Sequence, residues 1–501
     1  MAAFRRALVV LATVLILVLL LLLLVPAIAH ADSIATAAAG GRRTTSNDDV
    51  RPNLRRKKIM PDQTSKLDLR SYHHRAAAAA GRHRKLLEPS PGPSPAPSPG
   101  PSPAPSPEPS SQSGESAVEV DVASYGAVGD GQQDDTPAFR EAWAAACSSP
   151  QPATLVVPRE KTYLVKQTTF SGKCKSPVTF RLDGKLVAPA SRSAWPEENM
   201  RWWIMFRNVD GLTVTGDGTI DGNGETWWKS SCRVDKKLKC ANAPMALLLS
   251  RCNNLTVENI QLLNSQQIHM SVEDCQDVLL KGITITAPGD SPMNDGIHIA
   301  RTKDIQVLDC DIKTGDDCMS IETGTENLYA SRITCGPGHG ISIGSLGDDN
   351  SEARVSNITV YKAHLSGTTN GVRMKSWQGG KGYAKDVTFE DITMEEVHNP
   401  IIIDQNYCTS VDPANPKPCK KQTSAVEFSN IRFKNIRGTS ATKEAIKLDC
   451  SDTVPCRDIL LQDVKLTFHD RGHNHKHASA TSVCNNAKLT ESGTNVDPKP
   501  C

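Results

Sequence analysis

An internal repeat in the second half of the chain constrains its fold more than any other feature. Eight short apolar segments each open with Asn or Asp, and successive openings are 23, 27, 23, 30, 29, 44 and 28 residues apart. The opening residues are Asn254, Asp277, Asp304, Asn327, Asn357, Asp386, Asn430 and Asp458. This period fits one solenoid coil of three short strands with their turns, and inserted loops account for the longer coils. The segments are too short for a helical repeat.

Within these segments β-branched and other apolar residues alternate with polar ones. Alternate residues of a strand face the same side, so the apolar set can face inward and stack on the next coil about 4.8 Å away. The sequence therefore predicts an all-β fold, a single-stranded right-handed parallel β-helix, over residues 119–501. An amphipathic helix at 135–147 is expected to cap the N-terminal coil. The apolar face of that helix comprises Phe139, Ala142, Trp143 and Ala146.

The first 118 residues lack the repeat and divide into three segments. Residues 1–31, with an uncharged apolar run from Ala7 to Val25, predict a signal peptide and a secreted protein. An uncleaved membrane anchor is the alternative, because the run approaches bilayer-spanning length. Residues 32–88 predict a disordered region or propeptide, and the Pro/Ser-rich residues 89–118 predict a stiff linker.

The formal net charge of +2 is unevenly distributed. Residues 32–88 hold 13 basic and 6 acidic residues, whereas residues 89–501 hold 42 basic and 49 acidic residues. No nucleic-acid partner is expected for the acidic part. If the substrate is a polyanion, a few placed cations must attract it, because the overall charge of the domain repels it.

Fifteen cysteines in an exported chain indicate disulfides. Cys252, Cys275 and Cys310 lie inside apolar repeats and are expected to be buried thiols. A zinc site is the alternative, but the cysteines lack metal-ligand spacing, so no metal is expected. The spacing suggests six short-range pairs: Cys147 with Cys174, Cys232 with Cys240, Cys318 with Cys335, Cys408 with Cys419, Cys450 with Cys456, and Cys484 with Cys501.

The same period brings acidic residues together. Asp295 precedes Asp316 and Asp317 by 21 and 22 residues, and His339 follows them by 23 and 22. Each of these spacings corresponds to one coil, so the four side chains should lie near one face. A bend at Gly315 is expected to keep the adjacent aspartates on the same side. Glycosidic hydrolysis needs a protonated acid and an ionised base, and repulsion among clustered carboxylates raises one pKa. The structural alternative is that each aspartate caps a turn.

Arg373 and Lys375 are two residues apart, so on a strand they share a face. The arginine can bind a uronate carboxylate through two parallel hydrogen bonds, and the lysine can act as a point charge. The alternative is an ordinary solvated surface.

Four ordered motifs match a known family. They are Ser291-Pro292-Met293-Asn294-Asp295-Gly296-Ile297, Gly315-Asp316-Asp317-Cys318, Cys335-Gly336-Pro337-Gly338-His339-Gly340 and Arg373-Met374-Lys375. In order and spacing they resemble the signatures of the polygalacturonases, glycoside hydrolase family 28. The resemblance extends from about Val120 to near Cys501, which leaves out the N-terminal segments.

The resemblance implies inverting hydrolysis of α-1,4-linked galacturonic acid in pectin, without a metal or an organic cofactor. By the same resemblance, Asp316 is the general acid, and Asp295 and Asp317 hold and activate the water. His339 supports the acid.

The resemblance also implies that Arg373 and Lys375 bind the substrate carboxylate, with Tyr407 nearby. The expected partner is pectin in the plant cell wall, and the expected form is an extracellular monomer. Hydrolysis of another pectic backbone, such as rhamnogalacturonan, is an alternative that fits these two cations less well.

One departure from the family lies beside Asp295. Most members have Asn then Thr before the first catalytic aspartate, whereas this chain has Met293 and Asn294. A thioether cannot replace the hydrogen bonds of an amide, so the position of substrate or of Asp295 is expected to be less secure unless Asn294 compensates. A catalytically weak pectin-binding wall protein is therefore a further alternative.

Two other features have competing interpretations. Trp227 and Trp228 can stack on a sugar, but packing is the favoured interpretation. Asn254 and Asn357 begin glycosylation sequons, and both also occupy the opening position of a repeat, where a structural role competes.

Overall fold

The computed structural model describes residues 117–196, 200–409, 421–469, 477–490 and 495–501. The predicted signal peptide, the basic segment and almost all of the linker lie outside these ranges. No helix among the described residues is both long and apolar enough to cross a membrane.

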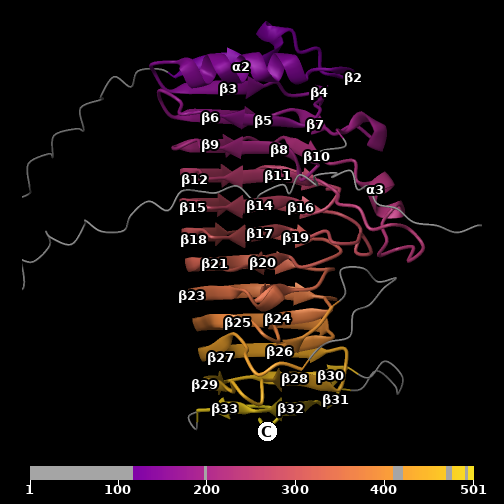
Figure 1. Ribbon diagram of the computed structural model, residues 1–501, viewed down its shortest axis with the longest axis vertical. Coiled ribbons are helices and arrows are strands. Elements are labelled where there is room, and N and C mark those ends of the chain that lie inside the picture. Colours follow the sequence, from indigo (N-terminus) through magenta and orange to yellow (C-terminus); the bar gives the residue numbers. More distant parts are fainter. Residues whose placement is uncertain (1–116, 197–199, 410–420, 470–476, 491–494) are drawn as a thin grey trace, which may run out of the picture. The chain divides into compact units, whose positions relative to one another are not determined.

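The strands form three ladders that stack coil upon coil (Figure 1). Within the described residues every ladder pairing is parallel except that of β30 with β31. The predicted parallel β-helix is confirmed.

The first ladder comprises β1 (Val118–Asp121), β3 (Ala153–Val157), β6 (Val178–Leu182), β9 (Leu212–Thr215), β12 (Asn253–Glu258), β15 (Gln276–Lys281), β18 (Lys303–Leu308), β21 (Glu326–Cys335), β23 (Glu352–Ser366), β25 (Lys381–Val397), β27 (Glu427–Ser440), β29 (Cys456–Gln462) and β33 (Ala487–Leu489). The second comprises β2 (Asp130–Asp134), β4 (Thr162–Leu164), β7 (Lys185–Val187), β10 (Thr219–Asp221), β13 (Gln261–Leu263), β16 (Thr284–Thr286), β19 (Asp311–Lys313), β30 (Lys465–His469) and β31 (His477–Ser479). The long strands β21, β23, β25 and β27 run through both ladders.

The third ladder comprises β5 (Thr168–Ser171), β8 (Trp202–Arg207), β11 (Met245–Ser250), β14 (Met270–Glu273), β17 (Ile297–Ala300), β20 (Met319–Ile321), β22 (Ile341–Leu346), β24 (Asn370–Trp377), β26 (Asn399–Tyr407), β28 (Glu444–Asp449) and β32 (Thr481–Asn485). The α-helices are α2 (Thr136–Ser148) and α3 (Glu225–Lys229), and short 3-10 helices are η2 (Val122–Tyr125), η3 (Arg192–Ala194) and η4 (Asp348–Asn350).

The Asn and Asp residues that open the repeats mark a bend in each coil. All eight adopt positive φ angles, between 52° and 59°. Asn and Asp tolerate this left-handed conformation better than other residues with a side chain. Their side chains also bond along the stack: Asn327 donates to Asp304 over 2.8 Å, and Asn357 donates to Asn327 over 2.9 Å. The sequon at Asn357 therefore does have a structural role.

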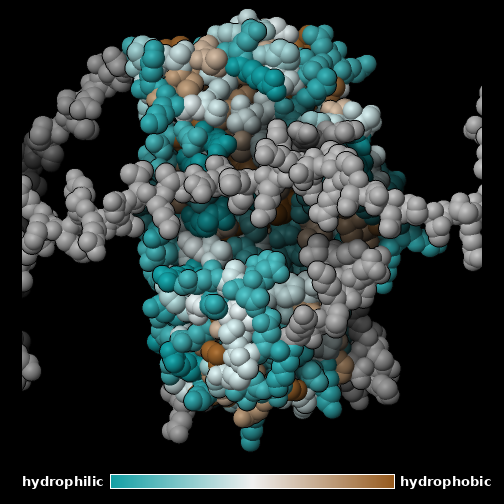
Figure 2. Space-filling view, viewed as in Figure 1, coloured by the Kyte–Doolittle hydropathy of each residue, from teal (hydrophilic) through white to brown (hydrophobic). Residues whose placement is uncertain are grey.

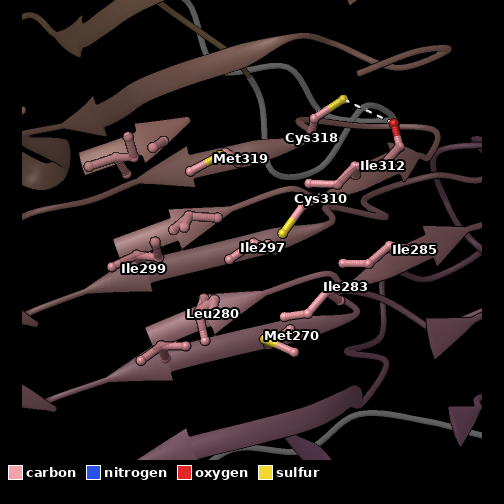
Figure 3. Close-up of a cluster of buried hydrophobic side chains, with 14 of the residues drawn as sticks. Met270, Leu280, Ile283, Ile285, Ile297, Ile299, Cys310, Ile312, Cys318 and Met319 are labelled. Carbon is pink, nitrogen blue, oxygen red and sulfur yellow. Dashed lines mark hydrogen bonds between the residues drawn. The ribbon is translucent and has the colours of Figure 1, made fainter. Parts of the chain in front are cut away.

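The interior is filled by stacked apolar side chains (Figure 3). Ile285 pairs in register with Ile312, and Ile297 lies in register between Met270 and Met319. All of these side chains are fully buried. Burial of a side chain of this size contributes about 1.5–3 kcal/mol, so the repeated coil supplies the core that a short strand lacks alone. The opposite sides of the strands face water, and Figure 2 shows a surface on which hydrophilic residues predominate among those described.

Helix α2 covers the N-terminal coil (Figure 1). Phe139, Ala142, Trp143 and Ala146 are buried, as predicted for its apolar face. The Trp143 ring packs against Phe170 and Phe206 at centroid distances of 5.3 and 5.4 Å, and its indole N–H donates to the carbonyl of Ser171. The predicted cap is confirmed.

Five of the six predicted cysteine pairs are disulfides in the structure: Cys147–Cys174, Cys232–Cys240, Cys318–Cys335, Cys450–Cys456 and Cys484–Cys501. Cys408 is also disulfide-bonded, and its predicted partner Cys419 lies outside the described residues. Cys252, Cys275 and Cys310 are free and buried, as expected.

Candidate active site

The four acid and histidine positions lie in the turns that lead into the third ladder. Asp295 precedes β17, Asp316 and Asp317 precede β20, and His339 precedes β22. These three strands are direct neighbours in the ladder. The coil period therefore brings the predicted residues to one edge of three consecutive strands.

Asp316 forms a pair with His339. The Nδ1 atom of His339 lies 2.8 Å from Oδ1 of Asp316, and the same oxygen accepts the Asp317 backbone N–H over 2.9 Å. Burial acts to raise the pKa of Asp316, but the hydrogen bond and charge of His339, together with the charge of Lys375 and the Asp317 backbone N–H, outweigh it and hold that pKa below its ordinary value. The same hydrogen bond raises the pKa of His339. The pair therefore retains a proton to higher pH than a free histidine does.

Asp317 is the most buried of the three aspartates, with 1% of its surface exposed. It accepts hydrogen bonds from Arg373 Nη2 over 2.6 Å, from Lys375 Nζ over 2.9 Å and from Ser342 Oγ over 2.9 Å. Burial alone would lower the pKa of Lys375, yet attraction to Asp317 raises it above its ordinary value. The two cations thus share one face, as predicted, and meet a carboxylate of the site itself.

Asp295 is half-buried and accepts a hydrogen bond from Ser320 Oγ over 2.7 Å. Its burial, reinforced by the negative charges of Asp316 and Asp317, raises its pKa well above the ordinary value. The repulsion expected among clustered carboxylates therefore acts most strongly on Asp295.

The adjacent residues Asp316 and Asp317 can act together because they lie in a turn rather than in a strand. Gly315 makes this turn possible: a Cβ atom at this position would lie 2.0 Å from the backbone oxygen of Ser291. Any other residue would push the two turns apart. The bend predicted at Gly315 thus arises from close backbone contact between coils.

Three further side chains of the site were not predicted. His298, Ser320 and Ser342 occupy one register position on successive strands of the third ladder, and Arg373 continues the same column. Ser320 and Ser342 donate to Asp295 and Asp317, and His298 Nδ1 lies 2.9 Å from Ser320 Oγ. Each of the three lies three positions after a turn residue of the site. This spacing, together with the alternation of side chains along a strand, could have predicted them from the sequence.

The two residues that depart from the family have different surroundings. Asn294 is fully buried, and its amide donates to the carbonyls of Ser265 and Gln267 over 2.8 and 2.6 Å. Met293 is 42% exposed and has a φ of 55°. Asn294 therefore ties the turn before Asp295 to the preceding coil, while the Met293 side chain is largely exposed.

Tyr407 ends β26 beside the two cations. Its ring centroid lies 5.5 Å from Lys375 Nζ and 5.2 Å from the ring of Trp377, in an edge-to-face arrangement. The tyrosine thus borders the site, and its place near the substrate carboxylate stays a prediction.

Asp316, Asp317 and His339 also have the spacing of a metal site, because their ligand atoms lie within 4.8 Å of one another. However, both Asp317 oxygens are bonded to cationic side chains, and His339 Nδ1 is bonded to Asp316. These three side chains are already paired with charged partners, which argues against a metal ion between them. Catalysis without a metal stays a prediction.

This parallel β-helix, with clustered carboxylates in its coil turns, is the scaffold of a carbohydrate hydrolase. The Glycosyl hydrolases family 28 model matches residues 147–493, so the chain belongs to that family. Its relatives include plant proteins. Polygalacturonase QRT2 of Arabidopsis thaliana is 48% identical over 75% of this chain and 83% of its own length. Polygalacturonase-2 of Solanum lycopersicum is 48% identical over 72% of this chain and 77% of its own length.

Solved structures show the same fold at lower identity. The polygalacturonase from Erwinia carotovora ssp. carotovora matches with a TM-score of 0.60 and 24% identity, over 75% of this chain and 98% of its own.

Proposed function

We propose that this protein is a polygalacturonase that hydrolyses α-1,4-galacturonosidic bonds of pectin with inversion at the anomeric carbon. One observation carries the proposal: the Asp316–His339 pair lies directly beside Asp317, which binds both Arg373 and Lys375. A carboxyl cluster supplies acid and base, and the adjacent cations suit an anionic sugar. Family membership and the names of the plant relatives support the same activity.

Asp316 acts as the general acid in this proposal. The pair with His339 holds one proton, and their hydrogen bond lets that proton pass to the Asp316 carboxyl. A proton transferred in this way neutralises the developing charge on the glycosidic oxygen.

Asp295 and Asp317 hold and activate the attacking water. Ser320 and Ser342 orient these two carboxylates. Because the pKa of Asp295 is raised, its ionised form is a stronger base than an ordinary aspartate.

Arg373 and Lys375 bind the substrate carboxylate while they remain in contact with Asp317. A guanidinium has five N–H donors and an ammonium has three, so donors remain after the contacts to Asp317 and Ser342. Tyr407 lines the same side.

Asp316→Asn tests the assignment. Loss of general acid catalysis should lower the release of reducing ends from polygalacturonate by roughly 100- to 10,000-fold. Asp277→Asn is the matched control, because Asp277 is exposed, lies on the first ladder and has a φ of 58° that asparagine also tolerates. Full activity of Asp316→Asn would contradict the site.

A substrate with an aryl leaving group separates the roles. Such a leaving group needs little protonation, so Asp316→Asn should regain most of its activity on an aryl galacturonide, whereas Asp317→Asn should not. A parallel assay on a rhamnogalacturonan backbone tests the alternative substrate, and the length profile of the products distinguishes endo from exo attack.

We further propose that the protein acts outside the cell, on wall pectin, as a monomer. Its disulfides are typical of proteins from oxidising compartments. Mass spectrometry of the secreted protein would locate its N-terminus and thereby test removal of residues 1–31.

A further inference from the structure

A strongly basic loop projects near the active site. Residues 232–240, here called the basic loop, are closed by the disulfide between Cys232 and Cys240. The loop carries four cations and one acid, which are Arg233, Lys236, Lys237, Lys239 and Asp235. The three lysines are exposed, and no acidic side chain of the described part of the chain forms an ion pair with them. This positive charge is therefore available to a ligand.

A cavity of about 220 Å³ lies against the base of the basic loop. Cys232, Arg233 and Cys240 form part of its wall, and Arg192, Trp227 and Gln266 form another part. The Arg192 guanidinium carbon lies 4.6 Å from the centroid of the Trp227 ring. The cavity thus brings two arginines together, one of them stacked on a buried tryptophan ring.

Two buried polar groups in this cavity lack protein partners. Gln266 is 1% exposed, and neither its amide nitrogen nor its oxygen is hydrogen-bonded within the described residues. The indole N–H of Trp227 likewise is buried and has no hydrogen-bond partner within the described residues. A buried polar group without a partner destabilises the protein, and a ligand rich in hydroxyl groups would relieve that penalty.

The cavity is joined to the turn that carries Asp295. Met293 and Gln267 also line it, and the carbonyl of Gln267 accepts the Asn294 amide over 2.6 Å. The turn of Gln266 and Gln267 leads into β14, which pairs with β17, the strand that follows Asp295. Adjacent coils lie about 4.8 Å apart, so a polysaccharide following the coil axis past Asp295 reaches the cavity within the next sugar units. Figure 1 shows α3 and the loops after it projecting beside β10 and β16.

We propose that the basic loop and this cavity form an accessory site that binds an un-esterified galacturonate unit of the substrate chain, on the N-terminal side of the catalytic aspartates. This inference rests on the proposed polygalacturonase activity and extends it to a second contact with the polymer. The cations can pair with the sugar carboxylates, and Gln266 can bond to the hydroxyls. The site also supplies local attraction in a domain whose overall charge is negative.

Charge reversal of the three lysines tests the basic loop. Lys236→Glu/Lys237→Glu/Lys239→Glu should raise KM for long polygalacturonate roughly 10-fold at low ionic strength and weaken the dependence of kcat/KM on salt. On the shortest oligomer that the wild type cleaves, KM should change less than twofold. The control is Lys281→Glu/Lys362→Glu/Lys385→Glu, which makes the same charge change on exposed lysines of β15, β23 and β25.

A second variant tests the cavity. Gln266→Met removes the unpaired amide at similar volume, so a merely structural glutamine predicts equal or higher Tm and the wild-type KM. The accessory site predicts a KM for the polymer that rises severalfold while Tm does not fall.

The outcomes separate this inference from the proposed function. Equal KM values for the lysine variant and its control, in an active enzyme, would overturn the accessory site and leave the polygalacturonase proposal standing. A wild-type protein that cleaves no galacturonate oligomer or polymer would overturn both. A KM effect that is equally large on the shortest oligomer would also overturn the accessory site, because it would place the loop at the catalytic centre.

Discussion

Asp295 accepts a hydrogen bond from Ser320 and faces two other carboxylates, whereas Asp316 is paired with His339. The same side chain therefore has a raised pKa at one position and a lowered pKa at the other. These directions are the reverse of the usual pattern, in which the general acid has the raised pKa, so the proton that Asp316 donates has to be held by its pair with His339.

Substitution of Asp295 should change stability in a pH-dependent way. A raised folded-state pKa stabilises the protein at low pH, and that contribution is lost as pH rises through the folded pKa. Asp295→Asn cannot ionise, so its Tm should exceed that of the wild type by an amount that grows with pH. Each pKa unit corresponds to about 1.4 kcal/mol, and each kcal/mol to roughly 2–4 °C. Calorimetry across the acidic to neutral range measures the difference.

Asp316→Asn is the control of opposite sign. A lowered folded-state pKa stabilises the protein above the ordinary aspartate value, and that contribution is lost as pH falls. This variant should be less stable than the wild type at neutral pH and approach it in acid. Equal pH dependence of the two variants would contradict the assigned electrostatics.

Met293 offers a test of the weak-enzyme alternative. Its side chain is exposed and its backbone is left-handed, a conformation that asparagine adopts more readily. Met293→Asn should therefore raise stability by up to about 1 kcal/mol and alter turnover only a few-fold, because Asn294 already holds the turn. A large gain in turnover would instead mean that the native protein is catalytically impaired.

At the scale of the element, each of the eight repeat strands owes its bend to a left-handed Asn or Asp and its register to the neighbouring coil. Asn430 has a φ of 53° and donates to Asp386 over 2.6 Å. The residue thus shapes its own strand, β27, and bonds to the adjacent strand β25.

Two substitutions at Asn430 separate these contributions. Asn430→Ala should lower the free energy of unfolding by roughly 1–2 kcal/mol, through backbone strain and a lost hydrogen bond. Asn430→Gly keeps the backbone relaxed and loses the side-chain bond, so it should be less destabilised than the alanine variant. Chemical denaturation measures both, and a glycine variant less stable than the alanine variant would argue against backbone strain.

At the scale of the whole molecule, the stability of each coil depends on the adjacent coils, because each coil contacts mainly its neighbours. The aromatic cluster of Trp143, Phe170 and Phe206 joins the cap to the first coils. Loss of the cap would expose the apolar interior at one end.

Trp143→Ala should therefore destabilise the N-terminal coils first. Removal of a buried tryptophan costs about 3–5 kcal/mol. Amide exchange should accelerate in β3 to β8 before it does so in β26 and β28. Trp202→Ala is a control that leaves the cap intact, since Trp202 is only half-buried. Uniform acceleration along the chain would show that the coils unfold as a single unit.

The sequence by itself determined the coil, the cap and the grouping of Asp295, Asp316, Asp317 and His339. These depend on local periodicity: strand alternation and a constant coil length convert spacing along the chain into position in space. It also indicated five disulfides, because each joins cysteines that are close in sequence.

Only the tertiary structure decided how the site is charged and held. The raised pKa of Asp295, the contact of Asp317 with both Arg373 and Lys375, and the support from Ser320 and Ser342 depend on burial and on distances between coils. Residue spacing specifies neither quantity, because a pKa sums the effects of all nearby charges and of lost solvent.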